Sequence, residues 1–121
     1  MLSAGRPTEI FLCTQPADMR RGFDGLMRMA SEHLEKNVLA GGLFVFFNRR
    51  RDRVKLLYWD EDGLAIWYKR LEAGTFELPR AVDDAASITL SPSELSLLLG
   101  GIDLSSVRRR KRYRVLKTSR S

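Results

Sequence analysis

Between residues 43 and 78 the sequence alternates short apolar stretches with short polar turns, and this pattern constrains the fold more than any other feature. Residues 43–47 (LFVFF) are all apolar, which is typical of a buried strand, and the stretches that follow alternate apolar and polar side chains. The turn DEDG at 60–63 ends in a glycine, which tolerates the positive φ of tight hairpins. The pattern predicts a β meander with strands at 43–48, 53–59, 64–70 and 75–78, separated by turns at 49–52, 60–63 and 72–74.

An amphipathic helix is predicted before this meander. Apolar side chains recur there at steps of three and four residues, which places them on one helical face. They are Phe23, Leu26, Met27, Ala30 and Leu34. We expect the helix to begin near Met19 or Asp24 and to end near Lys36. The side chain of Asp18 is expected to cap its start.

A second, shorter helix is predicted after the meander. It begins at residues 91–94 (SPSE), where a serine can cap the helix, a proline fits its first position and a glutamate completes a capping box. Leu95, Leu98 and Leu99 supply its buried face, and glycines follow it. Two further short strands are predicted, at 8–13 and 88–90.

These elements predict an α+β fold with a mainly antiparallel sheet of four to five strands, one packed helix and a short C-terminal helix. We expect a single domain over residues 1–104 and a basic, disordered tail over residues 105–121.

The composition predicts a cytoplasmic protein without metal or cofactor. No apolar run exceeds five residues, whereas a membrane span needs about 20. The start of the chain lacks the basic-then-apolar pattern of a secretory signal. Cys13 and His33 are the only residues of their types, which excludes an intramolecular disulfide and a zinc site of the Cys/His type.

The positive charge of the chain is concentrated at its end. Residues 105–121 hold eight basic side chains and no acidic one, whereas residues 1–104 hold 13 basic and 15 acidic side chains. Consecutive cations repel one another, and their usual partners are polyanions such as nucleic acid. The run comprises Arg108, Arg109, Arg110, Lys111 and Arg112.

A second basic cluster lies in the meander, at the turn before the second predicted strand. Its candidate phosphate contacts are Arg49, Arg50, Arg51, Arg53 and Lys55. The planar guanidinium can bind two phosphate oxygens, so a protruding arginine turn suits DNA contact. The alternative is that these arginines only solvate the turn. Four nearby aromatic residues, Tyr58, Trp59, Trp67 and Tyr68, either belong to the core or stack on bases.

Catalytic interpretations find little support in the residues. A nucleophilic site would need His33 as its base, and we expect this histidine to lie at a solvated helix edge and Cys13 to be a small buried side chain. A Mg²⁺ nuclease would use the acidic cluster at 60–62, but acidic residues before a glycine are typical of a hairpin turn.

Several motifs in the predicted domain together resemble one known family. They are DMRRGFDGL at 18–26, LFVF and NRR at 43–50, KLLYWD with a following glycine at 55–63, and RLE with G and F at 70–76. In order and spacing they resemble the TnpB-type accessory protein, the second reading frame of bacterial insertion sequences of the IS66 family. The resemblance covers about residues 8–104 and ends near Asp103. Its motif residues are Asp18, Arg20, Arg21, Gly22, Phe23, Asp24, Gly25, Trp59, Asp60 and Gly63.

The resemblance implies a non-catalytic accessory protein of DNA transposition that acts beside a separate transposase. It brings no catalytic residues with it. We expect Arg20 and Arg21 to pair with Asp24 or with phosphate, and Gly22 and Gly25 to allow close packing of the helix start on the sheet. DNA binding through the arginine clusters is the first hypothesis. The alternative is a protein-interaction module that docks on the transposase without direct DNA contact.

Overall fold

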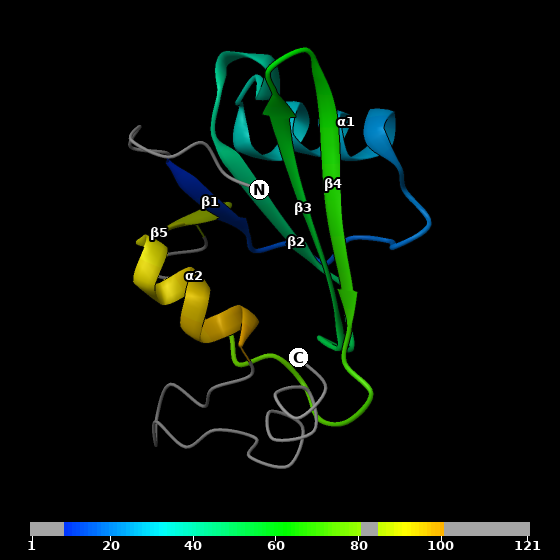
Figure 1. Cartoon of the computed structure of the whole chain (residues 1–121), viewed down its shortest axis with the longest axis vertical. Coiled ribbons are helices and arrows are strands. Elements are labelled where there is room, and N and C mark those ends of the chain that lie inside the picture. The colour runs from blue at the N-terminus through cyan, green and yellow to red at the C-terminus, as the bar shows by residue number, and fades with distance from the viewer. Residues whose placement is uncertain (1–8, 81–84, 101–121) are drawn as a thin grey trace.

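The structure, a computed structural model, describes residues 9–80 and 85–100 of the chain (Figure 1). These residues form a sheet with helices on both of its faces. In chain order the elements are β1 (Ile10–Cys13), α1 (Phe23–Leu34), the 3-10 helix η1 (Val38–Ala40), β2 (Leu43–Phe47), β3 (Arg53–Asp60), β4 (Gly63–Arg70), β5 (Ser87–Leu90) and α2 (Pro92–Leu99). The predicted α+β class is confirmed.

The sheet has the strand order β4-β3-β2-β1-β5. The pairs β2–β3 and β3–β4 are antiparallel, as the meander pattern predicts. The pair β1–β5 is also antiparallel, but β1 and β2 run parallel, with Leu12 beside Val45. The connection between them contains α1, because parallel neighbours need a crossover. The β3–β4 ladder runs without a bulge from the pair Arg53–Arg70 to the pair Asp60–Gly63. This ladder is the longest in the sheet. The two edge strands of the sheet are β4 and β5.

Alternation along the strands divides the apolar side chains between two cores. On one face, Leu26 and Ala30 of α1 are fully buried in a cluster with Phe44, Phe46 and Leu57 of the sheet. On the other face, α2 and the segment at 71–78 cover Val45, Leu56 and their neighbours. Figure 1 shows α1 crossing behind β3 and β4. The strands β1 and β2 and the first half of β3 are therefore buried on both faces.

The two helices differ in how well their starts were predicted. The capping box of α2 is confirmed, since the backbone N–H of Glu94 donates to Ser91 Oγ and that of Ser91 donates to Glu94 Oε1, at 3.1 and 2.8 Å. For α1 the predicted cap is wrong. The helix starts at Phe23 after Gly22, with no side-chain cap, and Asp18 closes a turn of its own upstream. Aspartate often does so, because its carboxylate can accept from the backbone two residues on.

The predicted strand at 75–78 is wrong. Phe76 is buried and packs its ring 5.2 Å from that of Phe47, and its backbone N–H donates to Arg51 O at 2.7 Å. The segment thus follows the covered face of the sheet instead of adding a strand beside β4. The predicted tail at 105–121, with its arginine run, lies outside the described residues.

Candidate nucleic-acid interface

The arginine turn between β2 and β3 is built around Asn48. Its Oδ1 accepts from the backbone N–H groups of Asp52 and Arg53 at 3.1 and 3.0 Å, and its Nδ2 donates to Asp52 Oδ1 at 2.6 Å. The backbone N–H of Arg51, which has a φ of +61°, donates to Asn48 O at 3.0 Å. The hydrogen bond from Asn48 lowers the pKa of Asp52. One amide side chain therefore fixes the shape of the whole turn.

The guanidinium groups of this turn are left available. Arg49, Arg50 and Arg51 are exposed, and within the part of the chain that the structure describes none of them forms an ion pair. Arg53 is half-buried and donates to Tyr68 Oη at 3.4 Å. The fixed backbone of the turn thus presents three positively charged side chains to solvent.

The loop between β1 and α1 lies against this turn. The backbone N–H of Ala17 donates to Phe47 O at 2.8 Å, which joins the loop to the end of β2. Asp18 accepts from the backbone N–H of Arg20 at 2.9 Å and from its guanidinium at 2.7 Å. The hydrogen bond from the Arg20 side chain lowers the pKa of Asp18 to about 2. Arg20 thus pairs with Asp18 and not with Asp24 as expected.

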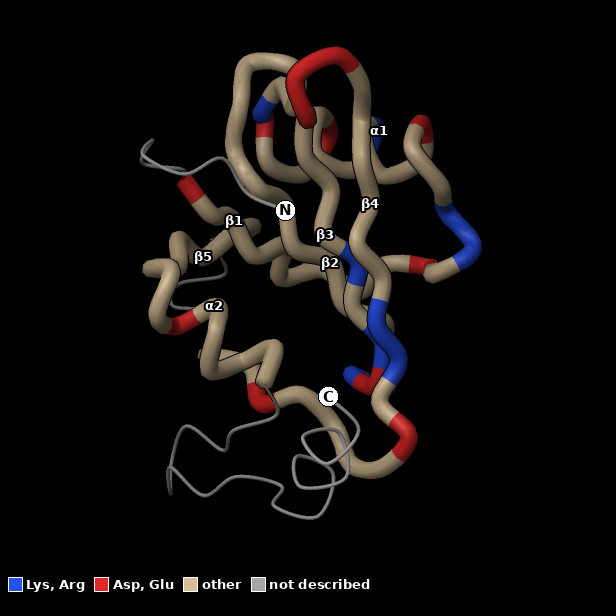
Figure 2. Tube along the Cα trace, in the orientation of Figure 1, with Lys and Arg blue, Asp and Glu red and all other residues tan. Residues whose placement is uncertain are grey.

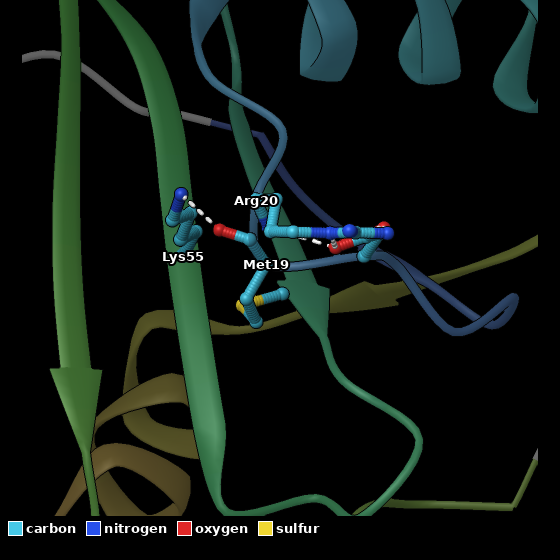
Figure 3. Close-up of polar contacts among 4 residues, drawn as sticks. Met19, Arg20 and Lys55 are labelled. Atoms are coloured by element: carbon cyan, nitrogen blue, oxygen red, sulfur yellow. Dashed lines mark hydrogen bonds and ion pairs between the residues drawn. The ribbon is translucent and has the colours of Figure 1, made fainter.

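Lys55 fastens the same loop to β3 (Figure 3). Its Nζ donates to Met19 O and to Arg21 O, both at 2.8 Å, and lies 4.7 Å from the centroid of the Tyr68 ring. Lys55 is only 8% exposed, so its ammonium group is satisfied inside the protein. This differs from the phosphate contact expected from the sequence, and we do not count Lys55 among the proposed DNA contacts.

Together the loop and the turn form a groove. Two adjoining cavities of about 380 and 290 Å³ share Ala17, Asp18 and Arg49 in their linings. Cations from both segments surround them: Arg21, Arg49, Arg50 and Arg53. The two carboxylates of the groove, Asp18 and Asp52, are each hydrogen-bonded to a neighbouring side chain. The groove is therefore net positive, and its acidic groups are already occupied.

The remaining motif residues do not line this groove. A Cβ on Gly22 would meet nothing within 4 Å, and the three atoms nearest to one on Gly25 all belong to the Arg21 side chain, so the expected close packing on the sheet is wrong. Arg21 instead donates to Gly25 O at 3.2 Å. Phe23 and Asp24, at the start of α1, are exposed. These positions shape the exposed entry to α1 rather than its core.

The acidic turn joins β3 to β4, as the hairpin interpretation predicts. Asp60 pairs with Gly63, and Glu61 between them has a φ of +56°. Nearby, the four aromatic residues that the sequence assigned either to the core or to base stacking divide into two pairs. Tyr58 and Trp67 pack against the core, whereas Trp59 and Tyr68 are 42% and 48% exposed.

The side chains considered for nucleophilic or metal chemistry, Cys13 and His33 among them, form no common site in the described residues. Cys13 is buried, as predicted, and burial raises the pKa of its thiol. His33 is exposed on α1, as predicted, at the margin of the groove. Over residues 9–80 and 85–100, no three His, Cys, Asp or Glu side chains are grouped so as to hold a metal ion. Within the same ranges no helix is long and apolar enough to cross a membrane.

Comparison with known proteins adds a family and two relatives. A family model described as "IS66 Orf2 like protein" (TnpB_IS66) matches residues 8–109. The uncharacterized protein y4jC of Sinorhizobium fredii (strain NBRC 101917 / NGR234) is 37% identical over 119 residues, which cover 98% of this chain and 100% of y4jC. The uncharacterized protein y4hO of the same strain is 39% identical over 103 residues, covering 85% of this chain and 88% of y4hO. No solved structure matches the chain.

The family match extends further than the resemblance seen in the motifs. It ends at residue 109 rather than near Asp103, so it includes Arg108 and Arg109 at the start of the basic run.

Proposed function

Because the chain belongs to the family of IS66 Orf2-like proteins, we propose that it is a non-catalytic accessory protein of DNA transposition that binds DNA directly. In this proposal it acts beside the transposase of the same element. The groove between the loop at 15–21 and the turn at 48–53 contacts the DNA backbone, and the basic run at 108–112 adds to the binding.

The observation that carries this proposal is the placement of cations around one groove. Arg49 and Arg50 extend from a turn that Asn48 holds in shape, and Arg21, from the loop, lines the same cavity as Arg49. In the described part of the chain Arg49 and Arg50 form no ion pair that phosphate would have to displace. Because Asn48 already holds the backbone that carries them, little backbone entropy is lost when these arginines bind an anion.

Contacts of this kind bind without reading sequence. Phosphate contacts set the register of a protein on DNA, whereas base edges in the grooves carry sequence information. The groove presents mainly guanidinium groups and short polar side chains. We therefore expect similar affinity for duplexes of different sequence, with a strong dependence on salt because bound phosphates release counterions.

The test measures duplex affinity of the full chain by fluorescence anisotropy at a series of salt concentrations. The double variant Arg49→Gln with Arg50→Gln removes two charges from the groove. Each phosphate contact contributes about 0.9 to the slope of log affinity against log salt, so we expect the slope to fall by about 2. The matched control is Arg28→Gln with Lys36→Gln, which removes two exposed charges from the helix region. This control should leave the slope nearly unchanged.

Two results would contradict the proposal. An unchanged slope in the groove variant would remove the groove from the DNA interface. Absence of duplex binding by the unaltered chain at low salt would remove DNA as a direct partner. The alternative of a module that docks on the transposase would then be favoured, and binding of the purified transposase in high salt would test it.

A further inference from the structure

The outer edge of β4 is open in a way that the other sheet edge is not. β4 has eight residues in unbroken register with β3, while β5 at the opposite edge has only four. Among residues 9–80 and 85–100, no strand pairs with the outer side of β4. The strand contains no proline or bulge, two devices that usually block edge pairing. The backbone N–H and C=O groups that point away from β3 can therefore accept another strand.

Charge along the β3–β4 hairpin indicates which strand fits there. Its tip carries the acidic residues Asp60, Glu61 and Asp62, and the far end of β4 carries Lys69 and Arg70. Figure 2 shows these acidic and basic stretches at opposite ends of the hairpin. An antiparallel copy of the same strand would place each acidic end beside the basic end of the other copy. The β3–β4 hairpin, with its acidic tip and the basic end of β4, is thus complementary in charge to an antiparallel copy of itself.

The pleat of the strand restricts how two copies can pair. A two-fold axis normal to the sheet keeps each face on the same side, so residues of one face must lie opposite residues of that face. Pairing centred on Ile66 satisfies this condition. It places Leu64 opposite Tyr68 and Ala65 opposite Trp67 of the second copy, and it brings Asp62, in the turn just before β4, to the end where Arg70 of the second copy lies. Each pair joins complementary sizes or opposite charges.

Exposed aromatic side chains lie on α1 and on the face of the β3–β4 hairpin that α1 covers. Within the described ranges the exposed large apolar residues include Phe23, Trp59 and Tyr68, which are 47%, 42% and 48% exposed. Trp59 and Tyr68 lie on the α1 face of the β3–β4 hairpin, and Phe23 is the first residue of α1, which packs on that face. Aromatic residues are enriched in protein interfaces because they bury large areas. Pairing along β4 would bring a second set of apolar side chains to the same face.

We propose that two copies of this chain pair antiparallel along β4 and form a symmetric dimer with one continuous sheet. The second copy is favoured over other partners by the self-complementary charge and by the match of side chains in the register above. Arg70 also contacts Glu72 at 3.0 Å, but both side chains are more than half exposed, so this bond is easily exchanged. The proposal does not rest on DNA binding.

The test follows the oligomeric state of the full chain by sedimentation velocity over a range of concentrations. Asp62→Arg and Arg70→Asp each place like charges opposite one another at two symmetric positions of the dimer. We expect each variant to raise the dimer dissociation constant at least tenfold, about 1.4 kcal/mol. The double variant restores opposite charges with their order exchanged and should recover the dimer. Glu32→Arg, on the exposed face of α1, makes the same charge change as Asp62→Arg and serves as its control.

Recovery in the double variant, with the control unaffected, would support pairing along β4 in this register. A chain that stays monomeric at all concentrations would overturn the proposal. So would a dimer that neither single variant weakens, because the contact would then lie elsewhere, for example in the tail at 105–121. Equal weakening by Glu32→Arg would also overturn it, since net charge and not the β4 edge would explain the effect.

Discussion

Replacement of Lys55 by methionine tests how the loop before α1 is held against the sheet. Methionine has a similar length and preserves much of the apolar stem, but it cannot donate a hydrogen bond. The change removes two bonds of 2.8 Å, to Met19 O and Arg21 O, and the contact with the Tyr68 ring. Because the side chain is only 8% exposed, water has little access to the space that the ammonium group leaves and cannot easily replace its hydrogen bonds.

The expected loss follows from these contacts. Hydrogen bonds to charged groups contribute about 1.5–3 kcal/mol each, but the two carbonyls lie in a partly exposed loop and can regain water. We therefore expect Lys55→Met to lower the free energy of unfolding by about 2–3 kcal/mol. For a urea slope of about 1–2 kcal/mol per molar, the midpoint should fall by about 1–3 M.

Lys36→Met provides a matched control for this measurement. Lys36 Nζ lies 4.7 Å from the Phe11 ring centroid, the same distance as Lys55 Nζ from the Tyr68 ring, but Lys36 is exposed. An exposed cation–π contact contributes about 0.5–1 kcal/mol, so the control should lose no more than that. Urea unfolding followed by circular dichroism measures both variants.

Equal losses in the two variants would refute the reasoning, because the carbonyl bonds would then add nothing beyond the ring contact. A large loss in Lys55→Met should also be accompanied by faster amide hydrogen exchange in the loop at 17–22, since this segment loses its attachment to β3. Fast exchange in the loop of the unaltered chain would contradict the proposed attachment.

Two further predictions concern local hydrogen bonds. Arg20→Ala should raise the pKa of Asp18 from about 2 toward its ordinary value of 3.8, as measured by NMR titration of the carboxyl carbon. Because the pKa is lowered in the folded state, the bond stabilises the fold above about pH 4 and its contribution is lost as the pH falls toward 2. Ser91→Ala should cost about 1 kcal/mol in urea unfolding through loss of the capping box, whereas Ser93→Ala in the same turn should change stability by less than about 0.5 kcal/mol.

The parts of the fold that the sequence predicts are those set by local patterns. Strands β2, β3 and β4 follow from apolar alternation and from turn residues between them, and the start of α2 follows from the residues at 91–94 alone. The strand predicted at 75–78 failed because a distant contact, between Phe76 and Phe47, decides where that segment lies. The parallel pairing of β1 with β2 is likewise invisible in either strand by itself.

In the candidate site, too, the sequence predicts local features but not contacts between distant segments. The run of arginines at 49–51 is a local feature, and the structure places it at an exposed turn as expected. The groove itself is not local, because its second wall is formed by the loop at 15–21, about 30 residues earlier in the chain. The motif DMRRGFDGL indicated that this loop matters, but nothing in the sequence placed it beside the arginine turn.

The alternation of β3 contains the information that Lys55 is buried and holds a loop. In an alternating strand, Lys55 shares its face with Leu57, and Leu57 is fully buried beneath α1. A lysine on a buried face must find oxygen acceptors, because an unpaired buried cation is too costly. The residues that follow β1 and precede α1 form a loop beside this part of β3, and two of their carbonyls accept. Lys55, which alternates with core residues, therefore holds the loop before α1 against the sheet. The exposed arginines of the neighbouring turn form no such bond within the described residues and stay available for a ligand.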